Sequence, residues 1–126
     1  MRMIKRVKEI IEANLLHYYI PLVVDAENPK VFPMYYGRIR GEKQVVFPAT
    51  NATGIGSALK EQKPAYIIVA DRAAGFEAYL LEGKAWYVSN EDDYDLVAEM
   101  RNECPSLPIH GAVILEVENV HLVPPP

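Results

Sequence analysis

The sequence predicts a mainly β fold, in which six antiparallel strands form a small closed or partly closed barrel with an N-terminal helix and two inserted helices. The first observation is a series of Val-, Ile- and Tyr-rich segments separated by Gly, Pro and Asn at short spacings, as in antiparallel meanders. The second is that apolar residues with helical spacing precede this series, and that residues typical of a helix start interrupt it at two places. The chain has 126 residues and no linker-like stretch, so we expect one domain over residues 1–126.

The first elements follow from spacing and composition. Ile4, Val7, Ile11 and Leu15 recur at helical spacing, which predicts an amphipathic helix over residues 3–15. Tyr-, Ile- and Val-rich composition then predicts a series of strands. We expect these strands over residues 17–26, 31–36, 43–47, 65–71, 77–89 and 112–117.

Three features interrupt the strand pattern. Gly83 falls within the fifth strand, so we expect a bend there. A short helix is expected over residues 53–62. Another helix is expected to follow a capping box of Ser89 and Asp92 and to end near Glu103.

Composition narrows the classes of partner. The chain has 17 acidic and 13 basic residues, and its net charge of −4 argues against nucleic acid, whose phosphates need clustered Lys and Arg. No apolar run approaches the ~18 residues of a membrane helix. Glu9, Glu12 and Asn14 interrupt any signal-peptide core, so we expect a cytoplasmic protein without a membrane partner. Cys104 is the only cysteine and the histidines are scattered, so we expect no disulfide and no metal site.

Residues 45–58 predict a buried strand, a short polar loop that begins at Pro48, and the start of a helix. A helix start leaves about four backbone N–H groups without internal partners and carries about half a positive charge, which suits a phosphate or carboxylate. Gly54 and Gly56 lack a Cβ, so a ligand can approach the backbone there. The alternative is a plain strand-to-helix connection with Thr53 as its N-cap.

The strand Phe32–Tyr36 is a second candidate site. Its large side chains can present one face to a planar ring, because Met and Tyr provide polarisable or flat contact surfaces. The alternative is that they fill the barrel. No nucleophile elbow is present, and the sequence leaves the catalytic residues unknown.

Taken in order, these segments resemble the FMN-binding split-barrel family, which includes small FMN-binding proteins and pyridoxamine 5′-phosphate oxidase-like proteins. The best local matches are residues 45–48 and 79–85, and the resemblance covers nearly the whole chain. It implies a split form of the barrel, FMN as cofactor, and a homodimer with flavin at the interface.

The resemblance also implies the cofactor-binding residues. Those for the flavin ring are Met34, Tyr35 and Tyr36. Those for the flavin tail are Pro48, Ala49, Thr50, Asn51, Thr53, Ser57 and Ala58. Many relatives bind the phosphate with a Lys-Thr pair at the helix start, where this chain has Gly54-Ile55. The pair can be replaced by other groups, namely Thr50, Asn51, Thr53, Ser57, Arg72 and bare N–H groups. Otherwise flavin binds weakly or the ligand has changed.

Three functions therefore stay open. The first is an FMN-binding flavoprotein with an oxidoreductase or electron-transfer role, acting with an unidentified redox partner or small-molecule substrate. The second is a non-catalytic binding module on the same barrel, for another phosphorylated or planar ligand. The third is a dimeric interaction protein without a ligand.

Overall fold

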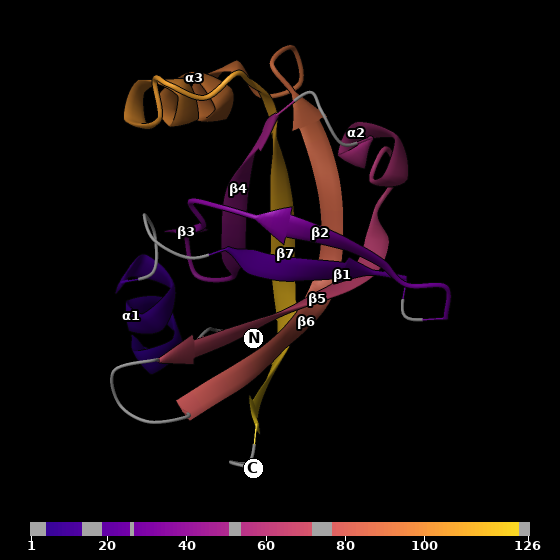
Figure 1. Ribbon diagram of the computed structural model, residues 1–126, viewed down its shortest axis with the longest axis vertical. Helices are drawn as coiled ribbons and strands as arrows, with labels where there is room; N and C mark the ends of the chain where they lie inside the picture. The colour runs from indigo at the N-terminus through magenta and orange to yellow at the C-terminus, as the bar shows by residue number, and fades with distance from the viewer. Residues whose placement is uncertain (1–4, 14–18, 26, 51–53, 72–76, 124–126) are drawn as a thin grey trace.

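The computed structural model describes residues 5–13, 19–25, 27–50, 54–71 and 77–123. Within these residues, three helices accompany seven strands that form one antiparallel sheet (Figure 1). The helices are α1 (Lys5–Ala13), α2 (Ile55–Ala58) and α3 (Tyr94–Glu103). The strands are β1 (Ile20–Val24), β2 (Lys30–Met34), β3 (Arg38–Arg40), β4 (Gln44–Thr50), β5 (Lys63–Asp71), β6 (Glu77–Ser89) and β7 (Ile109–Val123). The predicted mainly β fold is confirmed.

The sheet has one strand more than the six predicted, because residues 38–40 form the short strand β3. It pairs with β4 as a hairpin, and Gly41, at φ +66°, lies in the turn between them. Three residues are too few to show an alternating pattern, which is why this segment looks like a turn in the sequence. β4 also continues to Thr50, so Pro48 lies within a strand and does not begin a loop as predicted.

The sheet is split and does not close. Its strands follow the order β2-β1-β5-β6-β7-β4-β3, so β2 and β3 are its two edges. Over the described ranges, no ladder joins β2 to β3 or β4, although β2 and β4 are in contact (Figure 1). Side chains, and not backbone hydrogen bonds, therefore connect these two strands.

Two apolar clusters form the core. The larger one fills the inside of the curved sheet and includes Leu22, Phe47 and Leu115, all fully buried. The smaller one lies beneath α3 and includes Val46 and Met100. Because alternate residues of β4 belong to the two clusters, this strand is covered on both faces. This explains the unbroken apolar run that predicted a buried strand.

β6 is irregular at the predicted position. Its register with β7 shifts between Glu82 and Gly83. A Cβ on Gly83 would overlap the carbonyl oxygen of Glu116, so a side chain does not fit there without movement of the backbone.

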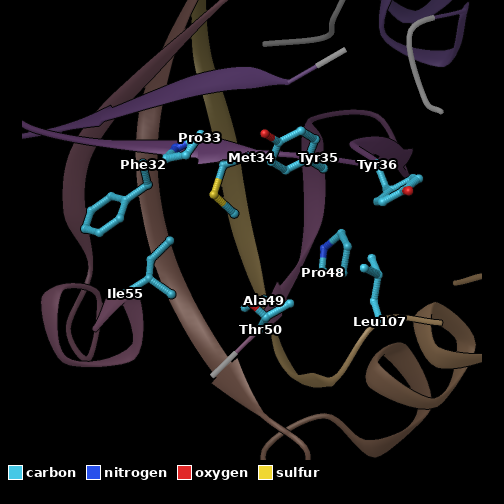
Figure 2. Close-up of a pocket in the computed structure, with 10 residues that line it drawn as sticks. All are labelled: Phe32, Pro33, Met34, Tyr35, Tyr36, Pro48, Ala49, Thr50, Ile55 and Leu107. Carbon is cyan, nitrogen blue, oxygen red and sulfur yellow. The ribbon is translucent and has the colours of Figure 1, made fainter. Parts of the chain in front are cut away.

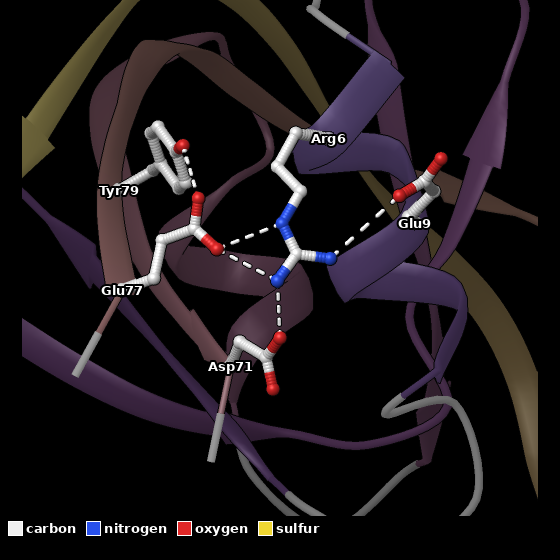
Figure 3. Close-up of polar contacts among 5 residues, drawn as sticks. All are labelled: Arg6, Glu9, Asp71, Glu77 and Tyr79. Carbon is white, nitrogen blue, oxygen red and sulfur yellow. Dashed lines mark hydrogen bonds and ion pairs between the residues drawn. The ribbon is translucent and has the colours of Figure 1, made fainter. Parts of the chain in front are cut away.

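α1 is anchored by a buried face and by one arginine. Ile11 is fully buried in the main core. On the neighbouring face, Arg6 donates from Nε to Oε1 of Glu77 over 2.7 Å and forms an ion pair with Asp71 (Figure 3). The hydroxyl of Tyr79 donates to Oε2 of the same glutamate over 2.8 Å. This cluster connects α1 to the end of β5 and the start of β6.

α3 begins later than the predicted capping box. Its N-cap is Asp93, whose Oδ1 accepts a hydrogen bond from the N–H of Leu96 over 3.2 Å. Ser89 and Asp92 do bond reciprocally, but in the turn before the helix: the N–H of Ser89 donates to Oδ2 of Asp92 over 2.9 Å, and the N–H of Asp92 donates to Oγ of Ser89 over 3.2 Å.

Candidate functional site

A cavity of about 440 Å³ lies at the split between β2 and β4 (Figure 2). One wall is formed by β2 and the two residues after it, and the other by the end of β4. Ile55 of α2 lies beside Phe32 at one end of the cavity, and Leu107 lies near Tyr36 at the other (Figure 2). The described lining residues are Phe32, Pro33, Met34, Tyr35, Tyr36, Pro48, Ala49, Thr50, Ile55 and Leu107.

The inner face of β2 carries every second residue of the strand. The antiparallel register pairs Lys30, Phe32 and Met34 with Val24, Leu22 and Ile20 of β1. Because the three β1 residues are buried in the core, their β2 partners share one face of the strand. Along this face burial increases from the exposed Lys30 through the half-buried Phe32 to the buried Met34. Met34 is 5% exposed, and its thioether points into the cavity (Figure 2).

The two tyrosines that follow β2 have different surroundings. Tyr35 is 53% exposed, and its ring centroid lies 6.1 Å from that of Tyr19. Tyr36 packs against the smaller core cluster with φ +57°, a backbone region uncommon for residues with a side chain. A Cβ on the next residue, Gly37, would stand 2.5 Å from the ring of Phe47. Close packing therefore fixes the backbone that holds Tyr36 beside the cavity.

The β4 wall is formed by three residues of different size. Pro48 has no N–H to donate, Ala49 is 3% exposed, and Thr50 is half-buried. The register of β4 with β7 shifts between Ala49 and Thr50. Such an irregularity redirects the side chains at the end of a strand, here toward the cavity.

Most of the residues predicted to contact flavin line this one cavity. They are Met34, Tyr35, Tyr36, Pro48, Ala49 and Thr50. Ser57 and Ala58 do not line it; they line a second hollow of about 360 Å³, of which Phe32 is also a wall. Asn51, Thr53 and Arg72 lie outside the described residues. That any of these residues binds a ligand stays a prediction.

The predicted helix start is different in the structure. α2 is a single turn and not a helix over residues 53–62, and its N-cap is Gly54 at φ +67°, without a side-chain cap. The N–H groups of Ser57 and Ala58 already donate to the carbonyl oxygen of Gly54, each over 3.1 Å. Two glycines lower the helix propensity of this segment. A single turn sums few peptide dipoles, so it provides little of the predicted anion-binding field.

The two glycines of this segment have different environments. An ideal Cβ on Gly54 would meet no atom within 4 Å, so the space beside its backbone is open. An ideal Cβ on Gly56 would lie 3.6 Å from the ring of Tyr87, so this glycine faces the sheet. The prediction that it faces a ligand is therefore wrong.

Sequence reasoning missed Ile55 and Leu107, and also Lys30 at the second hollow. Ile55 stands between two glycines in a segment whose polar residues predict a ligand loop, so the local pattern gives no signal for an apolar wall. Leu107 follows α3 and meets the cavity only through tertiary packing, so no local pattern identifies it. Lys30 did have a signal, because it lies two and four residues before Phe32 and Met34 and thus on the same strand face.

The ionisable groups with a shifted pKa lie outside the lining of the cavity. Hydrogen bonds with Arg6 and then Tyr79 lower the pKa of Glu77, and bonds with Ser89 lower the pKa of Asp92. Among the described residues, no three His, Cys, Asp or Glu side chains are grouped in a way that could hold a metal ion. No helix in the described ranges combines the length and apolar character needed to cross a membrane.

Comparisons with known proteins locate this arrangement among solved structures. No family model and no curated protein matches the sequence. HupZ of Group A Streptococcus aligns with a TM-score of 0.74 over 96% of this chain and 94% of its own, at 16% identity. A Lactobacillus delbrueckii protein provisionally named pyridoxamine 5′-phosphate oxidase aligns with a TM-score of 0.70 over 95% and 93%, at 17% identity. An FMN-binding protein of Syntrophomonas wolfei aligns with a TM-score of 0.61 over 93% and 83%, at 12% identity.

These similarities extend over nearly the whole chain, whereas the sequence identities are low. The likeness is therefore one of fold, and it agrees with the split antiparallel sheet and the helices around it. The chain has the split-barrel fold of the FMN-binding, pyridoxamine 5′-phosphate oxidase-like proteins, as its sequence predicts.

Proposed function

We propose that this protein is a flavoprotein that binds FMN in the cavity between β2 and β4. The observation that carries the proposal is the cavity itself, which lies at the split of the barrel and measures about 440 Å³. This volume is within the range typical of small-molecule sites. The fold shared with an FMN-binding protein gives independent support.

The lining of the cavity suits a planar, largely apolar ring. Met34 and Phe32 offer polarisable and flat surfaces from β2, and Pro48 of β4 adds an apolar ring surface near Tyr36 (Figure 2). The hydroxyls of Tyr36 and Thr50 are available for polar ring atoms. The described lining residues carry no charge, so a neutral ring enters without leaving an ion unpaired.

A bound flavin would supply hydride or electron transfer, and the chain would position the ring and limit its access to water. The inner wall, with Met34 and Ala49, is buried, whereas Tyr35 at the rim is half-exposed. The rim is therefore where a small-molecule substrate or a redox partner would approach. We accordingly infer an oxidoreductase or electron-transfer role of the pyridoxamine 5′-phosphate oxidase-like type.

The direct test is the visible absorbance of the purified protein, followed by fluorescence titrations with FMN, FAD and riboflavin. Two exposed tyrosines provide matched variants, because Tyr35 lines the cavity and Tyr94, on α3, does not. Tyr35→Ala is expected to weaken flavin binding by about two- to tenfold, the usual contribution of one aromatic contact. Tyr94→Ala is expected to bind as the wild type does. A colourless protein that takes up none of the three flavins would contradict the proposal.

A second candidate function is a binding module for another phosphorylated or planar ligand. The observation that favours it is Gly54-Ile55, where many relatives have the Lys-Thr pair that binds phosphate. Native mass spectrometry of freshly purified protein distinguishes the two, because a retained mass other than that of a flavin would favour this alternative.

We also propose that the protein is a homodimer. Tyr19 and Tyr35 lie in contact, and with Val31 they place exposed apolar side chains on β2 and just before β1, beside the cavity rim. A second copy covering this strip would also shield the cavity. Sedimentation should show a dimer that Tyr19→Glu dissociates, whereas Leu122→Glu, at an exposed apolar position on β7, should leave the dimer intact. A wild-type monomer at high concentration would overturn this part of the proposal.

A further inference from the structure

We propose that Lys30 provides the positive charge that binds the flavin phosphate in this chain, in place of the missing Lys-Thr pair. This inference rests on the proposed function. It concerns the second hollow, of about 360 Å³, and not the ring cavity. The described residues that line this hollow are Lys30, Val31, Phe32, Gly54, Ser57 and Ala58.

The two spaces adjoin one another. Phe32 lines both of them, and the consecutive residues Gly54 and Ile55 line one each. In Figure 2, Phe32 and Ile55 stand together at the α2 end of the ring cavity. A molecule whose ring occupies the first space therefore has a neighbouring space in which to place its tail.

The spacing along β2 agrees with such a molecule. Lys30, Phe32 and Met34 share the inner face of the strand, as their pairing with β1 shows. Lys30 and Met34 are four residues apart on an antiparallel strand, a span of about 13 Å. The ribityl chain of a flavin and the lysine side chain can bridge this span together. The cation thus lies where the tail of a ring beside Met34 would end.

The chemistry of the hollow fits a phosphate. Lys30 is the one charged side chain among the described residues that line either space. It makes no ion pair within the described ranges, so no internal anion competes for it. Ser57 contributes its hydroxyl, whereas its backbone N–H already donates to the carbonyl oxygen of Gly54. The open space beside Gly54 lets a ligand oxygen approach the backbone.

The location of the cation therefore differs from that in relatives with the Lys-Thr pair. There the charge is at the helix start, whereas here the helix is one turn long, begins at Ile55 and is preceded by glycine. In this chain a strand residue opposite that position supplies the charge, and the loop contributes space and a hydroxyl.

The experiment compares the affinities of FMN and riboflavin, which differ only in the phosphate. The variants are Lys30→Ala and Lys30→Arg, with Lys60→Ala as the matched control. Lys60 is an exposed lysine just after α2 that lines neither space. Lys30→Ala is expected to weaken FMN binding by about two- to fivefold and to leave riboflavin binding unchanged. Lys30→Arg should retain most of the FMN affinity, and Lys60→Ala should bind both ligands as the wild type does.

Two further measurements test the charge itself. Added salt should weaken FMN binding to the wild type more than to Lys30→Ala, because salt screens the ion pair. Inorganic phosphate added with riboflavin should bind more weakly to Lys30→Ala than to the wild type.

The outcomes separate the two proposals. If the wild type binds FMN and riboflavin equally, or if Lys30→Ala weakens both ligands alike, the inference about Lys30 is wrong while ring binding stands. If the wild type binds neither ligand, the proposed function fails and the inference fails with it. An equal loss of FMN affinity in Lys60→Ala would also overturn the assignment, because the effect would then be a general one of surface charge.

Discussion

The backbone N–H of Tyr87 in β6 donates a hydrogen bond to the carbonyl oxygen of Leu59, just after α2, over 2.9 Å. Pairing of β6 with β5 ends at Ala85, so this N–H is available to the segment that follows α2. The ring of the same tyrosine lies against Gly56 of α2 and close to Gly111 of β7. One tyrosine thus joins α2, which borders both the cavity and the second hollow, to the sheet.

The two glycines beside Tyr87 are expected to respond oppositely to alanine. A methyl group at Gly111 would overlap the Tyr87 hydroxyl and stand 2.5 Å from the carbonyl oxygen of Val88. Overpacking of this kind costs about 1–3 kcal/mol. At Gly56 the methyl group would make an ordinary contact, and alanine favours the helix by about 0.5–1 kcal/mol. Urea unfolding of Gly111→Ala and Gly56→Ala measures the change in the free energy of unfolding for each variant. Changes of the same sign would show that the packing around Tyr87 is not as described.

Arg6 is expected to be the side chain that anchors α1. Removing it in Arg6→Ala leaves the carboxylates of Asp71 and Glu77 close together without their shared cation. We expect a lower thermal midpoint and faster amide hydrogen exchange in α1. Lys5→Ala, which removes an exposed cation from the same turn, is the control. Equal exchange in the two variants would mean that apolar packing alone anchors the helix.

Glu77 is expected to make stability depend on pH. Its pKa is lowered, first by the hydrogen bond from Arg6 and then by that from Tyr79. A carboxylate with a lower pKa in the folded state stabilises the fold above its unfolded pKa of about 4.3, and this contribution disappears as the pH falls through the folded value. Wild type should therefore exceed Glu77→Gln in urea midpoint at neutral pH, and the difference should shrink below about pH 4. Asp92 keeps its lowered pKa in both proteins, so its effect cancels. A difference independent of pH would contradict this origin.

Asp93 is expected to stabilise α3 as its N-cap. Its carboxylate accepts from Leu96 and also lies 3.3 Å from Arg40. Asp93→Ala should lower the free energy of unfolding by about 1 kcal/mol, because it removes the cap. Asp93→Asn keeps an oxygen acceptor and loses only the exposed ion pair, so it should remain close to wild type. Chemical denaturation of the two variants thus distinguishes the N-cap hydrogen bond from the ion pair. If both variants lost the same free energy of unfolding, the stabilisation would come from the ion pair with Arg40.

The strands could be predicted where residue type alone determines structure. The apolar run of β4 and the irregularity at Gly83 both follow from local chemistry. β3 could not be predicted, since its hairpin partner is a tertiary contact. The single turn of α2 did have a local signal in its two glycines, whereas its contact with Tyr87 is tertiary. The same distinction applies to the site. The period of two along β2 places Met34 correctly and would have included Lys30, whereas Leu107 arrives from a distant segment.

The split between β2 and β4 has a consequence for how this barrel evolves and moves. Since no ladder spans the gap in the described residues, its width can change without breaking a strand hydrogen bond. Substitutions of a few side chains on these two strands can then adapt the cavity to a different ligand, while the pairing of the other strands stays the same. A ligand bound there would contact two strands that are far apart in the order of the sheet. The free energy of unfolding should therefore increase with the ligand concentration.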